Sequence, residues 1–311
     1  MKKPLIVIGG PTASGKTGLS VKLAKRINAE IISADSMQVY KYMDIGTAKI
    51  TKEEMQGVPH YLIDEFYPDE EFNVSIFKSR AKEYIEDIHS RGKIPLLVGG
   101  TGFYIQAVVN DNNFEETDND MTYRNDLYKL AEEKGKEYLY QMLKEVDLAS
   151  AKIIHQNNVK RVVRALEYYK QTGIPISVHN ELEKQRKSPY NVKNFMLTME
   201  RSFLYERINL RVDKMIEEGL IEEVKSLLNM GYSKDLVSMQ AVGYKEIIPY
   251  INGECTIEEA VAELKQATRH LAKRQLTWFN RQCEGEWIRV DELKEEEIIN
   301  KFLNSIEELL I

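Results

Sequence analysis

Short apolar runs alternate with amphipathic segments over the first hundred residues of the chain. Runs of this length, with apolar residues at nearly every position, are typical of parallel strands that are buried on both faces. We expect strands at 4–8, 30–34, 60–63 and 94–98, and helices from residue 15 and over 73–90. Strands that alternate with helices predict an α/β fold, in which helices cover both faces of a parallel sheet.

A different pattern begins after residue 111. Residues 112–189 contain amphipathic helical segments and no convincing strand, whereas an apolar run at 192–199 indicates a strand that returns to the sheet. Helices then continue to a short strand at 287–290 and a final helix. We therefore expect a core domain built from residues 1–111 and 190–311, and an all-helical insertion domain at 112–189.

The loop between the first strand and the first helix has a phosphate-binding sequence. Residues 10–17 read Gly-Pro-Thr-Ala-Ser-Gly-Lys-Thr, a complete G-x-x-x-x-G-K-[ST] pattern. In such a loop the backbone N–H groups converge on phosphate oxygens, the lysine adds a positive charge, and the last hydroxyl binds Mg²⁺. The pattern predicts a P-loop NTPase-like core with Mg²⁺ as cofactor. The residues expected to hold the phosphates are Gly10, Thr12, Ala13, Ser14, Gly15, Lys16 and Thr17, with Thr17 as the metal ligand.

Two more loops follow predicted strands and should meet the phosphate loop at the carboxyl edge of the sheet. Asp35 follows the second strand as a turn aspartate, a general base or an outer-sphere partner of Mg²⁺. Residues 99–102 read Gly-Gly-Thr-Gly, where many nucleoside triphosphatases carry an acidic residue for Mg²⁺. These glycines form a tight turn or let a substrate approach the backbone, with Thr101 offering a hydroxyl. The missing acid weakens the interpretation as a nucleoside triphosphatase.

Arg207 and Arg211 are spaced to share one face of a predicted helix. One interpretation is a solvated face on which they pair with Glu206 and Asp213, and the two arginines alone favour it. If the helix lies against the phosphate loop, one of them instead becomes a clamp for phosphate charge.

Two other predicted helices combine cations with aromatic residues. Such charge runs are usually solvated surfaces, but this mixture is also what RNA-binding surfaces use for phosphate contact and base stacking. The cations are Lys160, Arg161 and Arg164 on one helix and Lys265, Arg269 and Lys273 on the other, near Tyr168, Tyr169, Trp278 and Phe279.

Composition excludes several classes of protein. The chain has 311 residues, 43% of them hydrophobic, and a net charge of −6, which argues against indiscriminate binding to nucleic acid. Lys and Arg nevertheless outnumber Asp and Glu between Lys152 and Lys214. The 2 Cys and 5 His lack metal-ligand spacing, so neither a zinc site nor a disulfide framework is expected. No signal-peptide core or membrane-length run is present, and we expect a cytoplasmic, monomeric protein without membrane contact.

Taken together, these motifs resemble the tRNA dimethylallyltransferase (tRNA isopentenyltransferase) family of bacterial type, along nearly the whole chain. The zinc-binding extension of some eukaryotic relatives has no counterpart. The phosphate loop alone is shared by many proteins, but the ordered series of blocks is specific. The matching blocks are residues 10–17, 33–40, 44–49, 58–60, 98–104, 161–167, 240–246 and 272–279.

The resemblance implies that the dimethylallyl group of dimethylallyl diphosphate is transferred to N6 of the adenosine 3′-adjacent to the anticodon in tRNA. The phosphate loop would hold the diphosphate as leaving group, and Arg211 would reach the same diphosphate. Asp35 matches the family's proposed base, and Thr101 would position the amine. A base is needed because the lone pair of an exocyclic adenine amine is delocalised into the ring.

The resemblance also implies which segments contact the anticodon stem-loop of tRNA, with the helical insertion gripping it. The chain departs from the family pattern at 147–148 and 155–158, which leaves the nucleotide contacts of that edge open. The residues expected to contact tRNA are Asp35, Ser36, Met37, Gln38, Thr101, Val159, Lys160, Arg161, Val162, Val163, Arg164, Gln240, Ala241, Val242, Gly243, Tyr244, Lys245, Lys273 and Arg274.

Two alternatives remain open on the residues alone. A small-molecule or nucleotide kinase would use the phosphate loop to bind ATP and the insertion as a lid. The glycines after the strand at 94–98 and the basic, aromatic helices argue against it. A non-catalytic RNA-binding protein with a degenerate nucleotide site is the second alternative, and the intact Lys16 and Thr17 with Asp35 argue against that.

Overall fold

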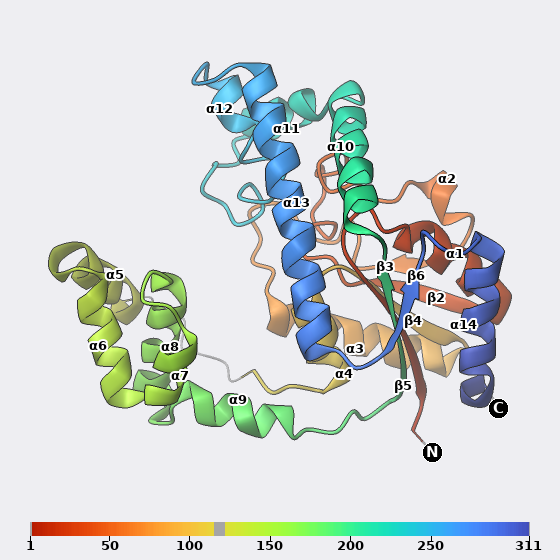
Figure 1. The fold of residues 1–311 in the computed structure, drawn as a ribbon, viewed down its shortest axis with the longest axis horizontal. Coiled ribbons are helices and arrows are strands. Elements are labelled where there is room, and N and C mark those ends of the chain that lie inside the picture. The colour runs from red at the N-terminus through yellow and green to blue at the C-terminus, as the bar shows by residue number, and fades with distance from the viewer. Residues whose placement is uncertain (1, 115–121, 311) are drawn as a thin grey trace. The chain divides into compact units, whose positions relative to one another are not determined.

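The structure, a computed structural model, describes residues 2–114 and 122–310. It divides the chain into two compact units. Residues 1–109 and 188–311 form the first, here called the core unit, and residues 110–187 form the second, here called the helical unit. Figure 1 shows a sheet with helices in the core unit and helices in the helical unit.

A parallel sheet forms the centre of the core unit. It has six strands in the order β3-β2-β4-β1-β5-β6, and every neighbouring pair is parallel. This confirms the expected α/β fold class, and the late strands β5 and β6 complete one side of the sheet. The strands are β1 (Pro4–Gly9), β2 (Ala29–Ser33), β3 (His60–Tyr61), β4 (Ile94–Gly99), β5 (Asn191–Thr198) and β6 (Glu286–Arg289).

The helices of the core unit begin at sequence-encoded caps. The side chain of Asn73 accepts the backbone N–H groups of Ser75 and Ile76 at the start of α3, and Thr256 with Glu259 forms a capping box on α13. Among the described residues, no helix is both long enough and apolar enough to cross a lipid bilayer. The helices are α1 (Lys16–Ile27), α2 (Lys52–Met55), α3 (Val74–Ser90), α4 (Gly102–Val109), α10 (Arg201–Glu217), α11 (Leu220–Asn229), α12 (Ile248–Ile251), α13 (Ile257–Gln282) and α14 (Glu295–Leu310).

Each face of the sheet has its own hydrophobic core. Successive side chains of a strand point to opposite faces, so a fully apolar strand supplies both cores. Val7 of β1 belongs to the core that includes Phe77 of α3, whereas Ile6 belongs to the core that includes Leu23 of α1 and Phe302 of α14. Burial of each such side chain contributes roughly 1.5–3 kcal/mol, which is why the apolar runs of the sequence become the central strands.

The ends of β2 and β4 approach each other closely at the carboxyl edge of the sheet. A Cβ atom at position 99 would lie 2.1 Å from the carbonyl oxygen of Ala34, so only glycine fits there. The same carbonyl accepts the backbone N–H of Thr101 at 3.1 Å. The loop that carries Asp35 is thereby held against the Gly-Gly-Thr-Gly turn.

The helical unit has a small core of its own. Leu127, Leu139, Leu143 and Leu166 are buried in this core. The buried carboxylate of Glu167 is compensated by ion pairs with two arginines of the same unit. Within its described residues the unit is helical, and residues 115–121 of the expected insertion lie outside the described part of the chain. Its helices are α5 (Thr122–Lys134), α6 (Lys136–Val146), α7 (Leu148–Ile153), α8 (Val159–Thr172) and α9 (Ile176–Lys184).

Candidate active site

Three loops meet at the carboxyl edge of the sheet and line one cleft. They follow β1, β2 and β4, and they contribute Lys16, Asp35 and Gly100 to its walls. Arg211 of α10 and Gln275 of α13 also line it. Ligands of open parallel sheets bind at this edge, so the cleft is the candidate substrate site.

The phosphate loop adopts a conformation that its glycines make possible. Gly10 has φ of 149°, and a Cβ atom there would lie 2.8 Å from the carbonyl oxygen of Leu197. Gly15 has φ of 86° directly before α1, whose first backbone N–H groups point toward the loop. The hydroxyl of Ser14 is buried and has no hydrogen-bond partner among the described residues. A buried polar atom of this kind is satisfied when a ligand oxygen is bound.

Lys16 is held inside the phosphate loop. Its ammonium group donates to the carbonyl oxygens of Gly10 at 3.0 Å and Pro11 at 2.7 Å. Burial is the main cause that lowers the pKa of Lys16 from 10.5 to about 7, the nearby charge of Arg211 adds to it, and Asp35 acts in the opposite direction. The loop therefore holds a cation that an anionic ligand would stabilise.

The arginines of α10 contact the phosphate loop. Arg207 donates from Nε to the carbonyl oxygen of Ala13 at 2.9 Å, and Arg211 donates to Oγ1 of Thr12 at 3.4 Å. Asp213 pairs instead with Lys265 at 2.6 Å. Arg207 is exposed, as expected for a solvated face, but both arginines contact the phosphate loop, and Asp213 is not their partner. Sequence periodicity showed that the arginines share a face, and only the packing of α10 shows what that face meets.

Asp35 combines two of its expected roles. Its Oδ1 accepts the backbone N–H groups of Met37 at 2.9 Å and Gln38 at 3.3 Å, which makes it a turn aspartate. Within the described residues these bonds use Oδ1, which leaves Oδ2 for a ligand in the cleft. Burial lowers the pKa values of Lys16 and Arg211, and the charge of Asp35 opposes that shift in both groups.

Thr101 lies next to this aspartate loop. Its Oγ1 accepts the backbone N–H of Ser36 at 3.2 Å. Because that bond uses a lone pair, the hydroxyl proton remains able to donate to a ligand. The structure thus brings together Asp35, Thr101, Arg211 and the phosphate loop.

A carboxylate that the sequence did not single out anchors the segments beside the cleft. Glu223 of α11 accepts the backbone N–H groups of residues 44, 45 and 46, and the hydroxyl of Tyr244 at 2.6 Å. A Cβ atom at Gly46 would lie 2.6 Å from the ring of Tyr244. The side-chain amide of Gln38 then donates to the carbonyl oxygens of residues 47 and 48. No motif surrounds Glu223, so its role becomes visible only in the fold.

The residues expected to contact RNA fall into separate groups. In the helical unit, Lys160 and Arg161 are exposed on α8, whereas Val162 and Val163 are buried in the core of that unit. In the core unit, α13 exposes Lys273 and Arg274, and the loop 240–245 exposes Gln240 and Lys245 but buries Tyr244. Side chains of the buried members are unavailable to RNA, so any contact there involves the backbone or neighbouring residues.

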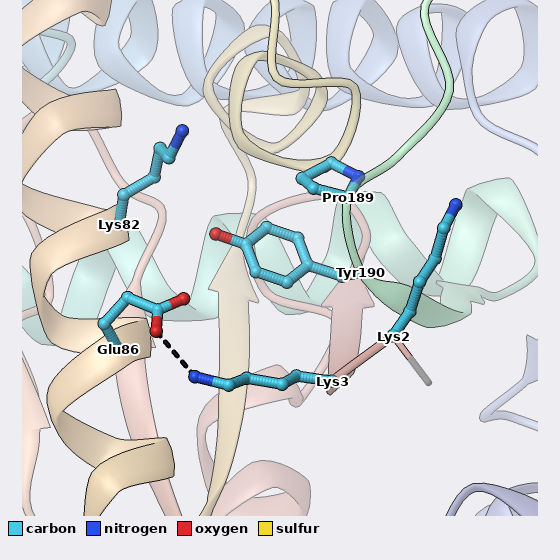
Figure 2. Close-up of a pocket in the computed structure, with 6 residues that line it drawn as sticks. All are labelled: Lys2, Lys3, Lys82, Glu86, Pro189 and Tyr190. Atoms are coloured by element: carbon cyan, nitrogen blue, oxygen red, sulfur yellow. Dashed lines mark hydrogen bonds and ion pairs between the residues drawn. The ribbon is translucent and has the colours of Figure 1, made fainter.

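A second pocket lies at the opposite edge of the sheet, where β1 begins. Figure 2 shows its lining of Lys2, Lys3, Lys82, Glu86 and Tyr190, with Pro189. Lys3 pairs with Glu86 at 2.6 Å, and Lys2 donates to the carbonyl oxygen of residue 188. The pocket is remote from the phosphate loop, and part of its charge is neutralised, so it is not the substrate site.

We predict that anion binding in the cleft weakens as the pH rises above about 7. An anion favours the charged form of Lys16, so the pKa of Lys16 is higher in the complex than in the free protein, where it is about 7. Between these two pKa values, binding of the anion is accompanied by uptake of a proton. The affinity for inorganic diphosphate should therefore fall, by at most about tenfold per pH unit. Calorimetric titration from pH 6 to 9 measures it.

The control for this prediction is Lys16→Arg, whose guanidinium stays charged over the whole range. Its profile should show only the titration of the diphosphate itself. Identical profiles for the two proteins would exclude Lys16 as the titrating group.

Comparisons with known proteins agree with this geometry. A family model described as IPP transferase matches residues 38–282. A tRNA dimethylallyltransferase of Lachnoclostridium phytofermentans is 58% identical over 286 residues, which are 92% of this chain and 91% of that protein. The crystal structure of a tRNA delta(2)-isopentenylpyrophosphate transferase from Staphylococcus epidermidis is similar at a TM-score of 0.74 and 45% identity, and covers 99% of this chain and 100% of that chain. A eukaryotic dimethylallyltransferase acting on tRNA is similar at a TM-score of 0.81 and 29% identity, over 99% of this chain and 84% of that chain. The chain belongs to the IPP transferase family.

Proposed function

We propose that this chain transfers the dimethylallyl group of dimethylallyl diphosphate to N6 of the adenosine 3′-adjacent to the anticodon in tRNA, and releases diphosphate. One observation carries the proposal: a phosphate loop and a carboxylate line the same cleft of an IPP transferase, and the hydroxyl of Thr101 is bonded to the loop that carries this carboxylate. The phosphate loop accounts for the leaving group. The carboxylate and hydroxyl account for the nucleophile.

The diphosphate is held where its charge increases. As the allylic C–O bond breaks, negative charge develops on the departing diphosphate. Lys16 and Arg211 supply positive charge there, and the buried hydroxyl of Ser14 and the N–H groups at the start of α1 supply donors. These groups are preorganised around the phosphate loop, so their stabilisation costs little reorganisation during the reaction.

The residues present fit a Mg²⁺ ion that binds together with the diphosphate substrate. Among the described residues, no cluster of three His, Cys, Asp or Glu side chains could hold a metal alone. Thr17 would contribute its hydroxyl and Asp35 an outer-sphere carboxylate, with phosphate oxygens as the other ligands. When bound, Mg²⁺ adds charge neutralisation on the diphosphate.

Asp35 and Thr101 act on the adenine amine. The hydroxyl of Thr101 positions N6, and Asp35 takes a proton from it as the new C–N bond forms. A duplex or stacked loop would keep N6 out of the cleft, so the adenosine leaves its stack. The tRNA is held by exposed cations, with Lys160 and Arg161 in the helical unit and Lys273 and Arg274 in the core unit.

The proposal assigns every role to residues of a single chain, and we propose that the protein acts as a monomer. A kinase acting on ATP is the weaker alternative. After β4 the chain has glycines in place of the acidic residue that holds Mg²⁺ in many nucleoside triphosphatases. Gly99 is moreover required for the close approach to Ala34.

The proposed reaction can be tested by following the transfer of a labelled group to tRNA. The protein and Mg²⁺ are incubated with unmodified tRNA and either labelled dimethylallyl diphosphate or labelled ATP. We expect label to enter tRNA from the prenyl donor alone, at the adenosine after the anticodon. Phosphate transfer from ATP to an acceptor, without prenyl transfer, would contradict the proposal.

We predict that Asp35→Asn lowers the single-turnover rate of prenyl transfer by roughly 10²- to 10⁴-fold, as expected for a lost general base. Asparagine keeps the acceptor for the turn N–H groups of residues 37 and 38, so the loop is preserved. Inorganic diphosphate should still bind. Asp87→Asn, on α3 outside the cleft, is the matched control, and a near-normal rate for Asp35→Asn would exclude this residue as the base.

We predict that tRNA affinity falls steeply with salt, because exposed cations release counterions from the RNA backbone. Lys160→Gln and Arg161→Gln should each reduce the slope of log affinity against log salt by about one. Filter binding from low to moderate salt measures it. Lys129→Gln changes an exposed lysine on α5 and should leave the slope unchanged. A slope that is equal in all four proteins would place RNA on a different surface.

A further inference from the structure

Gln275 of α13 lies between the two halves of the candidate active site. It lines the cleft together with Asp35, Gly100 and Arg211. Its side chain reaches the phosphate loop on one side and the Gly-Gly-Thr-Gly turn on the other. The mechanism proposed above assigns it no role, although its position separates the leaving group from the adenine amine.

The orientation of this side-chain amide is determined by the phosphate loop. Oε1 of Gln275 accepts the backbone N–H of Thr12 at 2.8 Å. A backbone N–H can only donate, so the carbonyl end of the amide must face the loop. The amide nitrogen therefore faces the opposite direction.

The amide nitrogen, Nε2, faces the Gly-Gly-Thr-Gly turn that contains Thr101. A Cβ atom at Gly100 would lie 2.3 Å from Nε2 of Gln275, so the amide nitrogen occupies the space that a side chain would take there. One helical turn later, Trp278 covers Gly102 in the same way, with Cδ1 2.0 Å from the position of a Cβ atom. Within the described residues no acceptor in the protein is recorded for Nε2. An amide donor is thus presented to the cleft next to the residues that handle N6.

We infer that Gln275 is a specificity-determining residue for the nucleobase: Nε2 donates a hydrogen bond to a ring nitrogen of the adenine whose N6 receives the prenyl group. The inference rests on the proposed function. Adenine carries acceptor nitrogens N1 and N7 on either side of N6, so a base held through N6 at Asp35 and Thr101 brings one of them toward Gly100. If the acceptor is N1, Nε2 also rejects guanine, whose N1 carries a donor, whereas N7 is an acceptor in both purines.

The experiment measures single-turnover prenyl transfer to anticodon stem-loops that carry adenosine, 1-deazaadenosine or 7-deazaadenosine at the target position. Each analogue replaces one acceptor nitrogen by C–H. We expect the wild-type rate to fall roughly tenfold with one of the two analogues, the loss of one hydrogen bond in a desolvated site. Gln275→Leu should lose a similar factor with adenosine and lose nothing further with that analogue.

Two further measurements separate a role in base recognition from a role in holding the phosphate loop. Gln266→Leu, on an exposed position of α13, is the matched control and should keep the wild-type response to both analogues. Inorganic diphosphate affinity of Gln275→Leu reports on the phosphate loop separately. If that affinity falls while sensitivity to both analogues is unchanged, Gln275 only holds Thr12 and the inference is overturned.

The rates of the wild-type protein test the inference even if the Gln275→Leu variant does not fold. Equal wild-type rates with adenosine and both analogues would overturn the inference while leaving prenyl transfer established. Absence of transfer even to the adenosine stem-loop, with full-length unmodified tRNA also inactive, would instead overturn the proposed function, and the inference with it.

Discussion

The cleft depends on one close approach, in which the backbone of Ala34 lies directly against Gly99. A side chain at position 99 would collide with a carbonyl oxygen, and backbone cannot move aside as a flexible side chain can. The approach lets the same carbonyl hold Thr101, and lets the Thr101 hydroxyl hold Ser36. The proposed base Asp35 and the neighbouring hydroxyl of Thr101 are thus fixed by short hydrogen bonds to the backbone, and their separation does not depend on long side chains.

The charges in the cleft determine which ligand it favours. Lys16 and Arg211 are both desolvated, and their charges repel each other. Asp35 is a carboxylate that stabilises the charged form of both. An acidic residue after β4 would have neutralised the site further and suited a bound metal. Glycines there leave an excess of positive charge that a diphosphate satisfies, which suits chemistry in which the phosphates depart. The helix α13 then connects this site to exposed cations, since Gln275 touches the phosphate loop while Lys273 and Arg274 face solvent.

Much of the fold could be predicted from the sequence because it is encoded locally. The apolar runs that become β1, β2 and β4 are recognisable without any partner, and so is the phosphate loop with its glycines and lysine. The switch to helical periodicity after residue 111 likewise follows from local pattern. Asp35 entered the candidate site through its position after a predicted parallel strand. Arg211 was assigned to the diphosphate through the resemblance to a family, since spacing does not show what a helix face contacts.

Tertiary structure alone decided which side chains meet. Gln275 lies on a helix whose periodicity shows a buried and an exposed face but not which loop the buried face covers. Glu223 carries no motif, yet it gathers three backbone N–H groups and a tyrosine hydroxyl from segments far along the chain. The parallel sheet and the phosphate loop can be predicted from local sequence, because hydrophobic periodicity and glycine conformation are local properties. The positions of Gln275, Glu223 and the arginines of α10 were decided by packing between distant elements, which local chemistry does not record.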